Sequence, residues 1–314
     1  MPNLRERTRA SYAAYRQRVV DALGHLYLDK ITPRQIKSFT LNLSEAGVNQ
    51  RTGGGLSPKS IKNYLGFLSS VFSYALESEL ISENPCVKVK PPAAGHSDRE
   101  WYTLDEAQYL LDSLSEAPVK YQAYIILAVF CGYRREELGG LEWGDIDFSN
   151  HIISISRASL YTKEKGVYTD DTKTRAAKRT QKQEAEVFDI LKKWRAEQAS
   201  TQLSLGDQWH KTNRVFTGDF GEPLHPNTPY TWLSRHCEKH GIRFLGIHAL
   251  RHLNASLRIS AGADVRTVAA ALGHAQASTT LNIYAYEFAE AQAASSQAVA
   301  NMLTQKKKSK KESG

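Results

Sequence analysis

Apolar side chains recur every three or four residues through the first third of the chain, a spacing that predicts helices with one buried face. Thr32-Pro33 and Ser57-Pro58 each predict a helix start, because a hydroxyl caps the first turn and proline suits its first position. The buried faces run through Tyr12, Tyr15, Val19, Leu23 and Leu26, and through Ile61, Tyr64, Leu65, Leu68, Val71, Phe72 and Ala75. Residues 1–92 are therefore expected to form a helical domain, followed by a linker over residues 93–99.

The pattern over the rest of the chain is mixed. Thr103-Leu-Asp-Glu predicts a capped helix, and the apolar positions between Ile125 and Phe130 predict a buried one. After Asp147 the apolar positions alternate, which predicts a strand and a small hairpin sheet reaching residue 180. Helical spacing then returns. The expected fold is mainly α, with a mostly helical α+β domain over residues 100–290, a small antiparallel sheet within it, and a C-terminal helix with a lysine-rich tail over residues 291–314.

Composition excludes several classes of protein. Of the 314 residues, 41% are hydrophobic and 24% are charged, close to globular averages and unlike a disordered or fibrous chain. The longest apolar stretch, residues 123–131, is far shorter than the ~20 residues that span a bilayer. The arginine-rich start lacks the apolar core of a secretory signal. Three widely spaced cysteines form no disulfide framework, which suits the reducing cytoplasm.

The charge is unevenly distributed along the chain. The net charge of +8 divides into +6 on residues 1–92, +4 on residues 306–314 and −2 on the residues between them. Such an excess on one helical domain favours contact with a polyanion over an ordinary solvated surface. The outward-facing candidates for phosphate contact are Arg16, Arg18, Lys59 and Lys62. Arg175, Lys178 and Arg179 form a second basic group in the expected hairpin, where the alternative is an exposed turn.

Four short groups of residues carry candidate chemistry, and each also has an ordinary structural explanation. They are Cys131-Gly-Tyr-Arg134-Arg-Glu-Glu137, Thr172-Lys173-Thr-Arg175, His248-Ala-Leu-Arg251-His252, and Leu272-Gly-His274 with Tyr284 ten residues later. Arg134 and Glu137 have the spacing of a helix-surface ion pair. His248 and His252 have the i, i+4 spacing of a zinc site, but no glutamate follows the first histidine and no third ligand lies nearby, which argues against a metal.

Taken in this order, the four groups resemble those of the tyrosine recombinase (phage integrase) family, most closely the integrases of phages or conjugative transposons. The resemblance covers roughly residues 5–290 and implies a helical core-type DNA-binding domain followed by a catalytic domain. It departs from the usual pattern at Leu253, where threonine is common, and at Tyr286, where histidine is common. Tyr286 also introduces a rival nucleophile, although the ten-residue spacing from His274 favours Tyr284.

The resemblance also implies a role for each matching residue. Tyr284 would attack a backbone phosphate and form a 3′-phosphotyrosyl link, while Arg134 and Arg251 would bind the non-bridging oxygens. Lys173 would protonate the leaving 5′-oxygen as the general acid. His248 would assist removal of the tyrosine proton, and His274 would hydrogen-bond the phosphate. Glu137 would support the arginines. The exchange of one phosphoester for another conserves bond energy, so no ATP, metal or other cofactor is expected.

Function and partners follow from the resemblance as expectations. The leading hypothesis is a site-specific recombinase that integrates and excises a mobile element. It would act on double-stranded DNA, as a homo-tetramer on two recombination sites. An excision or directionality factor and a host DNA-bending protein are expected as partners, and no membrane is expected. The alternatives are a chromosome-dimer or plasmid resolvase, a type IB topoisomerase and a non-enzymatic DNA-binding regulator. Since the chain begins directly at the basic domain, it is expected to be a shorter member or one without its arm-binding domain.

Overall fold

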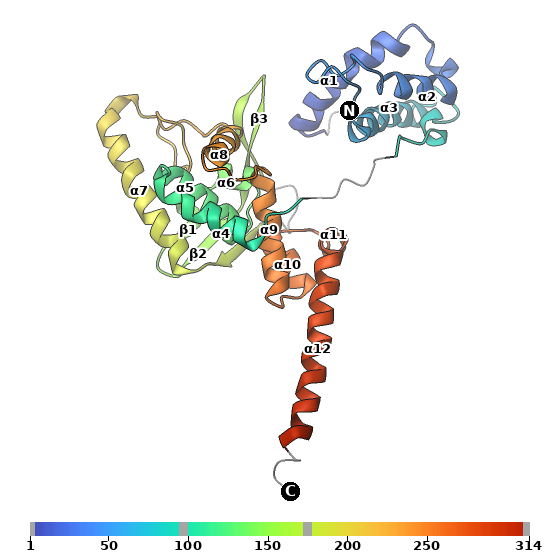
Figure 1. Cartoon of the computed structure of the whole chain (residues 1–314). Helices are drawn as coiled ribbons and strands as arrows, with labels where there is room; N and C mark the ends of the chain where they lie inside the picture. Colours follow the sequence, from blue (N-terminus) through green and yellow to red (C-terminus); the bar gives the residue numbers. More distant parts are fainter. Residues whose placement is uncertain (1–3, 94–99, 172–177, 310–314) are drawn as a thin grey trace. The chain divides into compact units, whose positions relative to one another are not determined.

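A computed structural model describes residues 4–93, 100–171 and 178–309 (Figure 1). The chain divides into two compact units, Met1–Arg99 and Glu100–Gly314. Lys173 and Arg175, two of the residues singled out above, lie outside the described residues. None of the helices in the described ranges is long and apolar enough to cross a membrane.

Within residues 4–93, the first unit consists of three helices and two short 3-10 turns. The helices are α1 (Glu6–Leu23), α2 (Pro33–Asn42) and α3 (Pro58–Glu77), and the turns are Leu28–Lys30 and Pro85–Lys88. The predicted starts of α2 and α3 are confirmed. Thr32 accepts a hydrogen bond from the Gln35 amide and Ser57 accepts one from the Ser60 amide. The apolar faces meet in one core that includes Ile36, Phe39, Ile61, Leu65, Leu68 and Phe72.

The second unit combines helices with small antiparallel sheets. Helices α4 (Leu104–Ser113), α5 (Val119–Ile126) and α6 (Arg135–Gly140) come first. Strands β1 (Ile146–Asp147), β2 (Ile152–Ile155) and β5 (Arg179–Lys182) form one sheet, and β3 (Arg157–Thr162) and β4 (Gly166–Asp171) form a hairpin. The remaining helices are α7 (Ala185–Leu205), α8 (Thr228–Lys239), α9 (Ile247–Ser260), α10 (Val265–Leu272), α11 (Ala277–Ile283) and α12 (Ala285–Ser309). The mainly α fold with a small antiparallel sheet is therefore confirmed.

The end of α5 differs from the simple buried helix that the sequence predicts. The chain continues as a π-turn over Leu127–Cys131, which is wider than an α-turn, and Phe130 is 42% exposed instead of buried. The Asn254 amide of α9 donates to the carbonyl oxygens of Val129 and Phe130, both at 2.9 Å. A polar side chain from a distant helix thus satisfies backbone groups of the widened turn.

The last helix also differs from expectation. Helix α12 begins at Ala285, immediately after Tyr284, so the expected boundary between residues 290 and 291 falls inside a continuous helix. Its first turns pack on α9 and α11 through Phe288 and Ala291 (Figure 1). Farther along, Val299, Met302 and Leu303 are exposed at spacings that place them on one side of the helix.

Gly132 offers a test of how tightly α9 is fitted to this turn. Its backbone is left-handed, with φ of 65°, and an added Cβ would lie 2.7 Å from Asn254 Oδ1. We expect Gly132→Ala to lower the free energy of unfolding by about 1–3 kcal/mol, because it adds backbone strain and displaces the amide. Denaturant unfolding measures the loss. In the control Gly144→Ala the added Cβ meets open space, and an equal loss there would contradict this account.

Candidate active site

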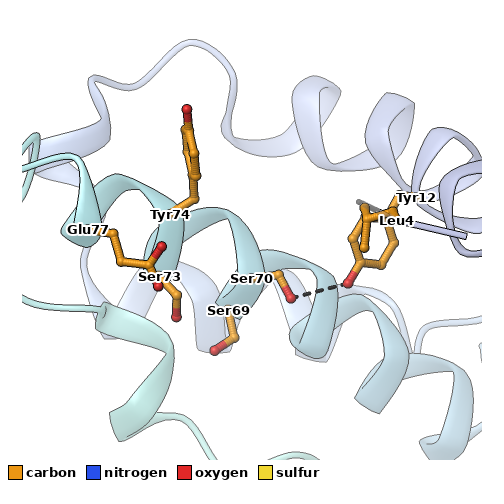
Figure 2. A pocket seen from close by; sticks show the side chains of 7 residues that line it. All are labelled: Leu4, Tyr12, Ser69, Ser70, Ser73, Tyr74 and Glu77. Atoms are coloured by element: carbon orange, nitrogen blue, oxygen red, sulfur yellow. Dashed lines mark hydrogen bonds between the residues drawn. The ribbon is translucent and has the colours of Figure 1, made fainter. Parts of the chain in front are cut away.

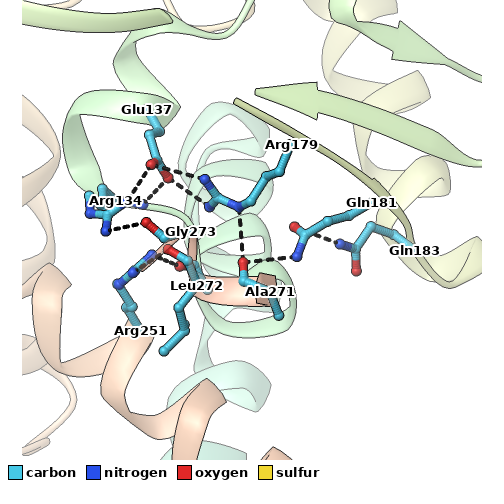
Figure 3. Close-up of polar contacts among 10 residues, drawn as sticks. Arg134, Glu137, Arg179, Gln181, Gln183, Arg251, Ala271, Leu272 and Gly273 are labelled. Carbon is cyan, nitrogen blue, oxygen red and sulfur yellow. Dashed lines mark hydrogen bonds and ion pairs between the residues drawn. The ribbon is translucent and has the colours of Figure 1, made fainter. Parts of the chain in front are cut away.

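Three arginines converge on the C-terminal end of α10 (Figure 3). Arg179 Nε donates to the carbonyl of Ala271 at 2.9 Å, Arg251 to that of Leu272 at 2.5 Å, and Arg134 to that of Gly273 at 3.1 Å. The last carbonyl groups of a helix lack partners within it and carry partial negative charge. Cationic donors are therefore favoured at this end, and α10 places three of them side by side.

Glu137 joins two of these arginines. Its carboxylate accepts from Arg134 Nη1 at 2.7 Å and from both Nη groups of Arg179, at 3.0 and 2.9 Å. It also accepts from the Arg134 backbone amide at 2.9 Å, which caps α6. Burial alone would raise the pKa of Glu137, but the hydrogen bonds and charges of Arg179 and Arg134 outweigh it and lower the pKa. The Arg134–Glu137 pair is thus a buried support and not a helix-surface ion pair.

Arg251 is the most enclosed of the three arginines. Its side chain lies almost fully inside the protein, with 3% of the residue exposed, and donates to the Gly132 carbonyl at 2.7 Å. Burial, followed by the charge of Arg134, lowers the pKa of Arg251 to about 9. We call Arg134, Arg179, Arg251 and Glu137 the arginine cluster. It holds three positive charges and one negative charge, so a bound anion would relieve its remaining repulsion.

Two histidines lie beside the arginine cluster. Burial and the charge of Arg251 lower the pKa of His248, and the same two causes lower the pKa of His274 to about 4. His274 Nδ1 lies 2.7 Å from the Thr280 hydroxyl. With that hydroxyl as donor, a neutral His274 carries its proton on Nε2. This ring can therefore hydrogen-bond an anion without adding charge.

Tyr284 lies where α11 ends and α12 begins, and 1% of it is exposed. Its hydroxyl is 2.5 Å from His252 Nδ1. Tyr286, the rival nucleophile, is 73% exposed at the start of α12. The structure therefore puts the phenol of Tyr284 beside His252 of α9. The sequence analysis named His252 as part of the His248–His252 motif and as a candidate zinc ligand, and gave it no catalytic role. Its i, i+4 spacing from His248 was the signal that the two histidines share one side of the helix.

The structure exposes some of the predicted DNA-contacting residues and buries others. Arg16, Lys59 and Lys62 are exposed on α1 and α3, and Lys178 is exposed before β5. Arg18 is half-buried and donates to the Tyr64 hydroxyl at 3.2 Å and to the Val48 carbonyl at 3.1 Å, which fastens α1 to α3. Arg179 was predicted to contact DNA from a basic hairpin, with an exposed turn as the alternative, but the structure buries its side chain on β5. Its side chain is 7% exposed because Glu137 binds its guanidinium in a fork.

A shallow hollow of about 390 Å³ lies on the first unit, between α1 and α3 (Figure 2). It is lined by serines, by Tyr12, whose hydroxyl is 3.2 Å from Ser70 Oγ, and by the Glu77 carboxylate. Its lining lacks a basic side chain, so it does not suit a phosphate. Across the described residues, no group of three or more His, Cys, Asp and Glu side chains is placed to hold a metal ion.

Known proteins resemble this chain along most of its length. The phage integrase family matches residues 100–290, and the phage integrase SAM-like domain matches residues 3–90. A tyrosine recombinase XerC-like protein of Caldanaerobacter subterraneus subsp. tengcongensis is 28% identical over 249 residues, 74% of this chain and 63% of that protein. The ICEBs1 integrase of Bacillus subtilis is 24% identical over 259 residues, 82% of this chain and 68% of that protein.

The same likeness extends to solved structures. The Tn1549 transposon integrase, in complex with transposon right end DNA, superposes with a TM-score of 0.77 at 22% identity, covering 95% of each chain. At this level of identity the match shows a shared fold. The chain spans less than two thirds of the length of its XerC-like relative.

The ion pairs of Glu137 can be tested through stability. We expect Glu137→Gln to lower the free energy of unfolding at pH 7 by about 3 kcal/mol, because it leaves buried arginine charge without a counterion. The pKa of Glu137 is lowered by folding, so its pairs stabilise the protein above the usual carboxyl range and lose that effect as the pH falls through it. Unfolding measured from pH 7 down to about pH 2, below the ordinary carboxyl range, should show the difference between the two proteins shrinking. A constant difference would contradict the assignment.

Proposed function

Because the chain belongs to the phage integrase family, we propose that it is a site-specific DNA recombinase that cuts and rejoins strands through a 3′-phosphotyrosyl intermediate. The observation that carries this proposal is the arginine cluster beside a buried tyrosine. Arg251 is almost completely buried, and the one carboxylate of the cluster forms its ion pairs with Arg134 and Arg179. A phosphodiester supplies the missing negative charge, and its two non-bridging oxygens match the two donors of the planar guanidinium fork.

The proposed reaction uses residues from four segments. The phenol oxygen of Tyr284 bonds to phosphorus and the bond from phosphorus to the 5′-oxygen breaks. Arg134 and Arg251 stabilise the charge on the non-bridging oxygens, and neutral His274 donates a hydrogen bond. Lys173 gives the leaving oxygen its proton, and His248 completes the site beside Arg251. The reverse reaction restores the DNA and the phenol, so the proposal includes no cofactor.

The DNA would be held by both units. On the first unit, exposed Arg16, Lys59 and Lys62 are the proposed phosphate contacts, and on the second Lys178 and Arg175 are added to them. Such contacts give affinity and register but not sequence specificity. The more enclosed Arg18 and Arg179 instead stabilise the units that present these cations. The localisation proposed for such an enzyme is the cytoplasm.

We place the recombinase with mobile elements, as an enzyme of integration and excision. Support comes from the ICEBs1 integrase and from the Tn1549 transposon integrase, whose fold this chain shares over 95% of its length. The XerC-like relative favours resolution of chromosome dimers or plasmids as the second candidate. Sequencing the DNA junctions formed in cells separates the two, since integration joins two unrelated sequences and resolution joins copies of one site. A directionality factor and a DNA-bending protein are proposed partners of the first activity.

Assembly into a tetramer would use the end of α12. An apolar groove of about 310 Å³ lies between α4, the π-turn and α9, and its walls include Leu104, Leu111, Phe130 and Leu257. The exposed stripe of Val299, Met302 and Leu303 is also apolar and has the width of one helix face. We assign the groove to the α12 stripe of a second copy of the chain. Each protomer then offers one groove and one helix, which suits a closed ring.

The nucleophile is tested with a suicide substrate nicked beside the cleavage point. We expect a covalent protein–DNA adduct that is lost in Tyr284→Phe and kept in Tyr286→Phe, because the Tyr284 phenol lies beside Arg251 and His252 of α9. Gel electrophoresis under denaturing conditions measures the adduct. Loss in Tyr286→Phe instead would reassign the nucleophile, and no adduct with any chain would favour a non-enzymatic DNA-binding regulator.

Docking of α12 is tested by placing a charge on its apolar stripe. We expect Met302→Glu to lower recombination between two sites at least about tenfold, since burying an unpaired carboxylate costs more than the 1.4 kcal/mol that this factor represents. Binding to a single site should change less than about twofold. Gln297→Glu puts the same charge on the other side of the helix and is the matched control. Equal recombination by Met302→Glu and the unaltered chain would exclude the docking.

A further inference from the structure

His252 is placed to act directly on the phenol of Tyr284. Its Nδ1 atom is 2.5 Å from the tyrosine hydroxyl oxygen, a contact between α9 and the junction of α11 with α12. His252 follows Arg251 in sequence and lies one turn beyond His248. The phenol therefore contacts the imidazole of the residue that follows the buried Arg251 in sequence.

Aromatic packing fixes the orientation of the His252 ring. Trp101 packs against it with ring centroids 4.4 Å apart, and the His248 ring meets it edge-on at 4.7 Å. Trp101 also lies 6.3 Å from the Tyr284 ring. An imidazole held between neighbours in this way keeps one nitrogen directed at the phenol. This arrangement would lose less conformational entropy during reaction than a mobile side chain.

We infer that His252 is the catalytic residue that takes the proton of Tyr284, the task which the family resemblance gave to His248. His252 has its nitrogen at hydrogen-bond distance from the phenol, whereas the His248 ring packs perpendicular to the His252 ring. His248 lies one helical turn before Arg251, on the side of the arginine cluster. The geometry thus separates the two histidines into one for the phenol and one for the phosphate.

The inference rests on the proposed function and balances as a single displacement. Neutral His252 accepts the phenol proton on Nδ1 while the tyrosine oxygen bonds to phosphorus and the bond to the 5′-oxygen breaks. The 5′-oxygen takes a separate proton from the general acid. A phenol has an ordinary pKa near 10 and an imidazole one near 6.5. Full transfer before attack is therefore unfavourable, so the proton moves as the new bond forms, and the nearby Arg251 charge stabilises the developing phenolate.

The experiment measures the single-turnover rate of adduct formation on the nicked suicide substrate. We expect His252→Asn to be slower by about 10²-fold or more, because the asparagine amide can accept a hydrogen bond near the Nδ1 position but cannot take a proton. 3,5-Difluorotyrosine at position 284 lowers the pKa of the phenol and so reduces the need for a base. Difluorotyrosine should raise the rate of adduct formation by His252→Asn at least about tenfold. It should change the rate of the chain with His252 much less.

The matched comparison is His248→Asn, whose rate we expect difluorotyrosine not to restore. DNA binding and thermal unfolding of each variant check its fold, and His252→Gln replaces His252→Asn if that protein is unstable. The inference is overturned if the His252 variants cleave at the unaltered rate, or if difluorotyrosine rescues His248→Asn and not the His252 variants. An adduct that persists in Tyr284→Phe would also overturn the inference, whereas the absence of any adduct with the unaltered chain would overturn the proposed function, which keeps the two failures distinct.

Discussion

The arrangement of the second unit depends on the uncapped carbonyl groups at the end of α10. Helix termination at Gly273, in the left-handed conformation, exposes three consecutive carbonyls. They accept hydrogen bonds from Arg134 on α6, Arg179 on β5 and Arg251 on α9. Segments more than one hundred residues apart are thereby fixed to one point. Without this negative helix end, the repulsion among three guanidiniums would disperse them.

Glu137 reduces the repulsion among the three arginines without neutralising all of their charge. One buried carboxylate binds two of the arginines, so the cluster keeps an excess of positive charge inside the protein. The lowered pKa values of Arg251, His248 and His274 all report that excess together with burial. A fully neutralised cluster would be more stable but would attract no anion. The Glu137 carboxylate therefore reduces the repulsion among the arginines and still leaves positive charge that can bind an anion.

The tyrosine occupies a different environment from the arginines. It belongs to the small core formed by α9, α10 and α12, which includes Ala255, Ile259, Val268 and Leu272. This core fixes the ring, while His252 contacts its hydroxyl. Because α12 starts at the next residue, the backbone that carries the tyrosine also carries the exposed apolar stripe. The same packing that orients the phenol thus determines where the last helix leaves the unit.

The sequence by itself determined the local elements and the identity of most candidate site residues. The starts of α2, α3 and α4 were predictable because each cap joins residues only three positions apart, as between Thr103 and Glu106. The order of the motifs pointed to the phage integrase family, which the comparisons confirm. Tertiary structure alone decided what these residues contact. It buried Arg179 against Glu137, 42 positions away, exposed Phe130 at a π-turn, and paired His252 with Tyr284 across 32 positions. Such pairings follow from how whole helices pack, and a short sequence pattern carries no information about distances between them.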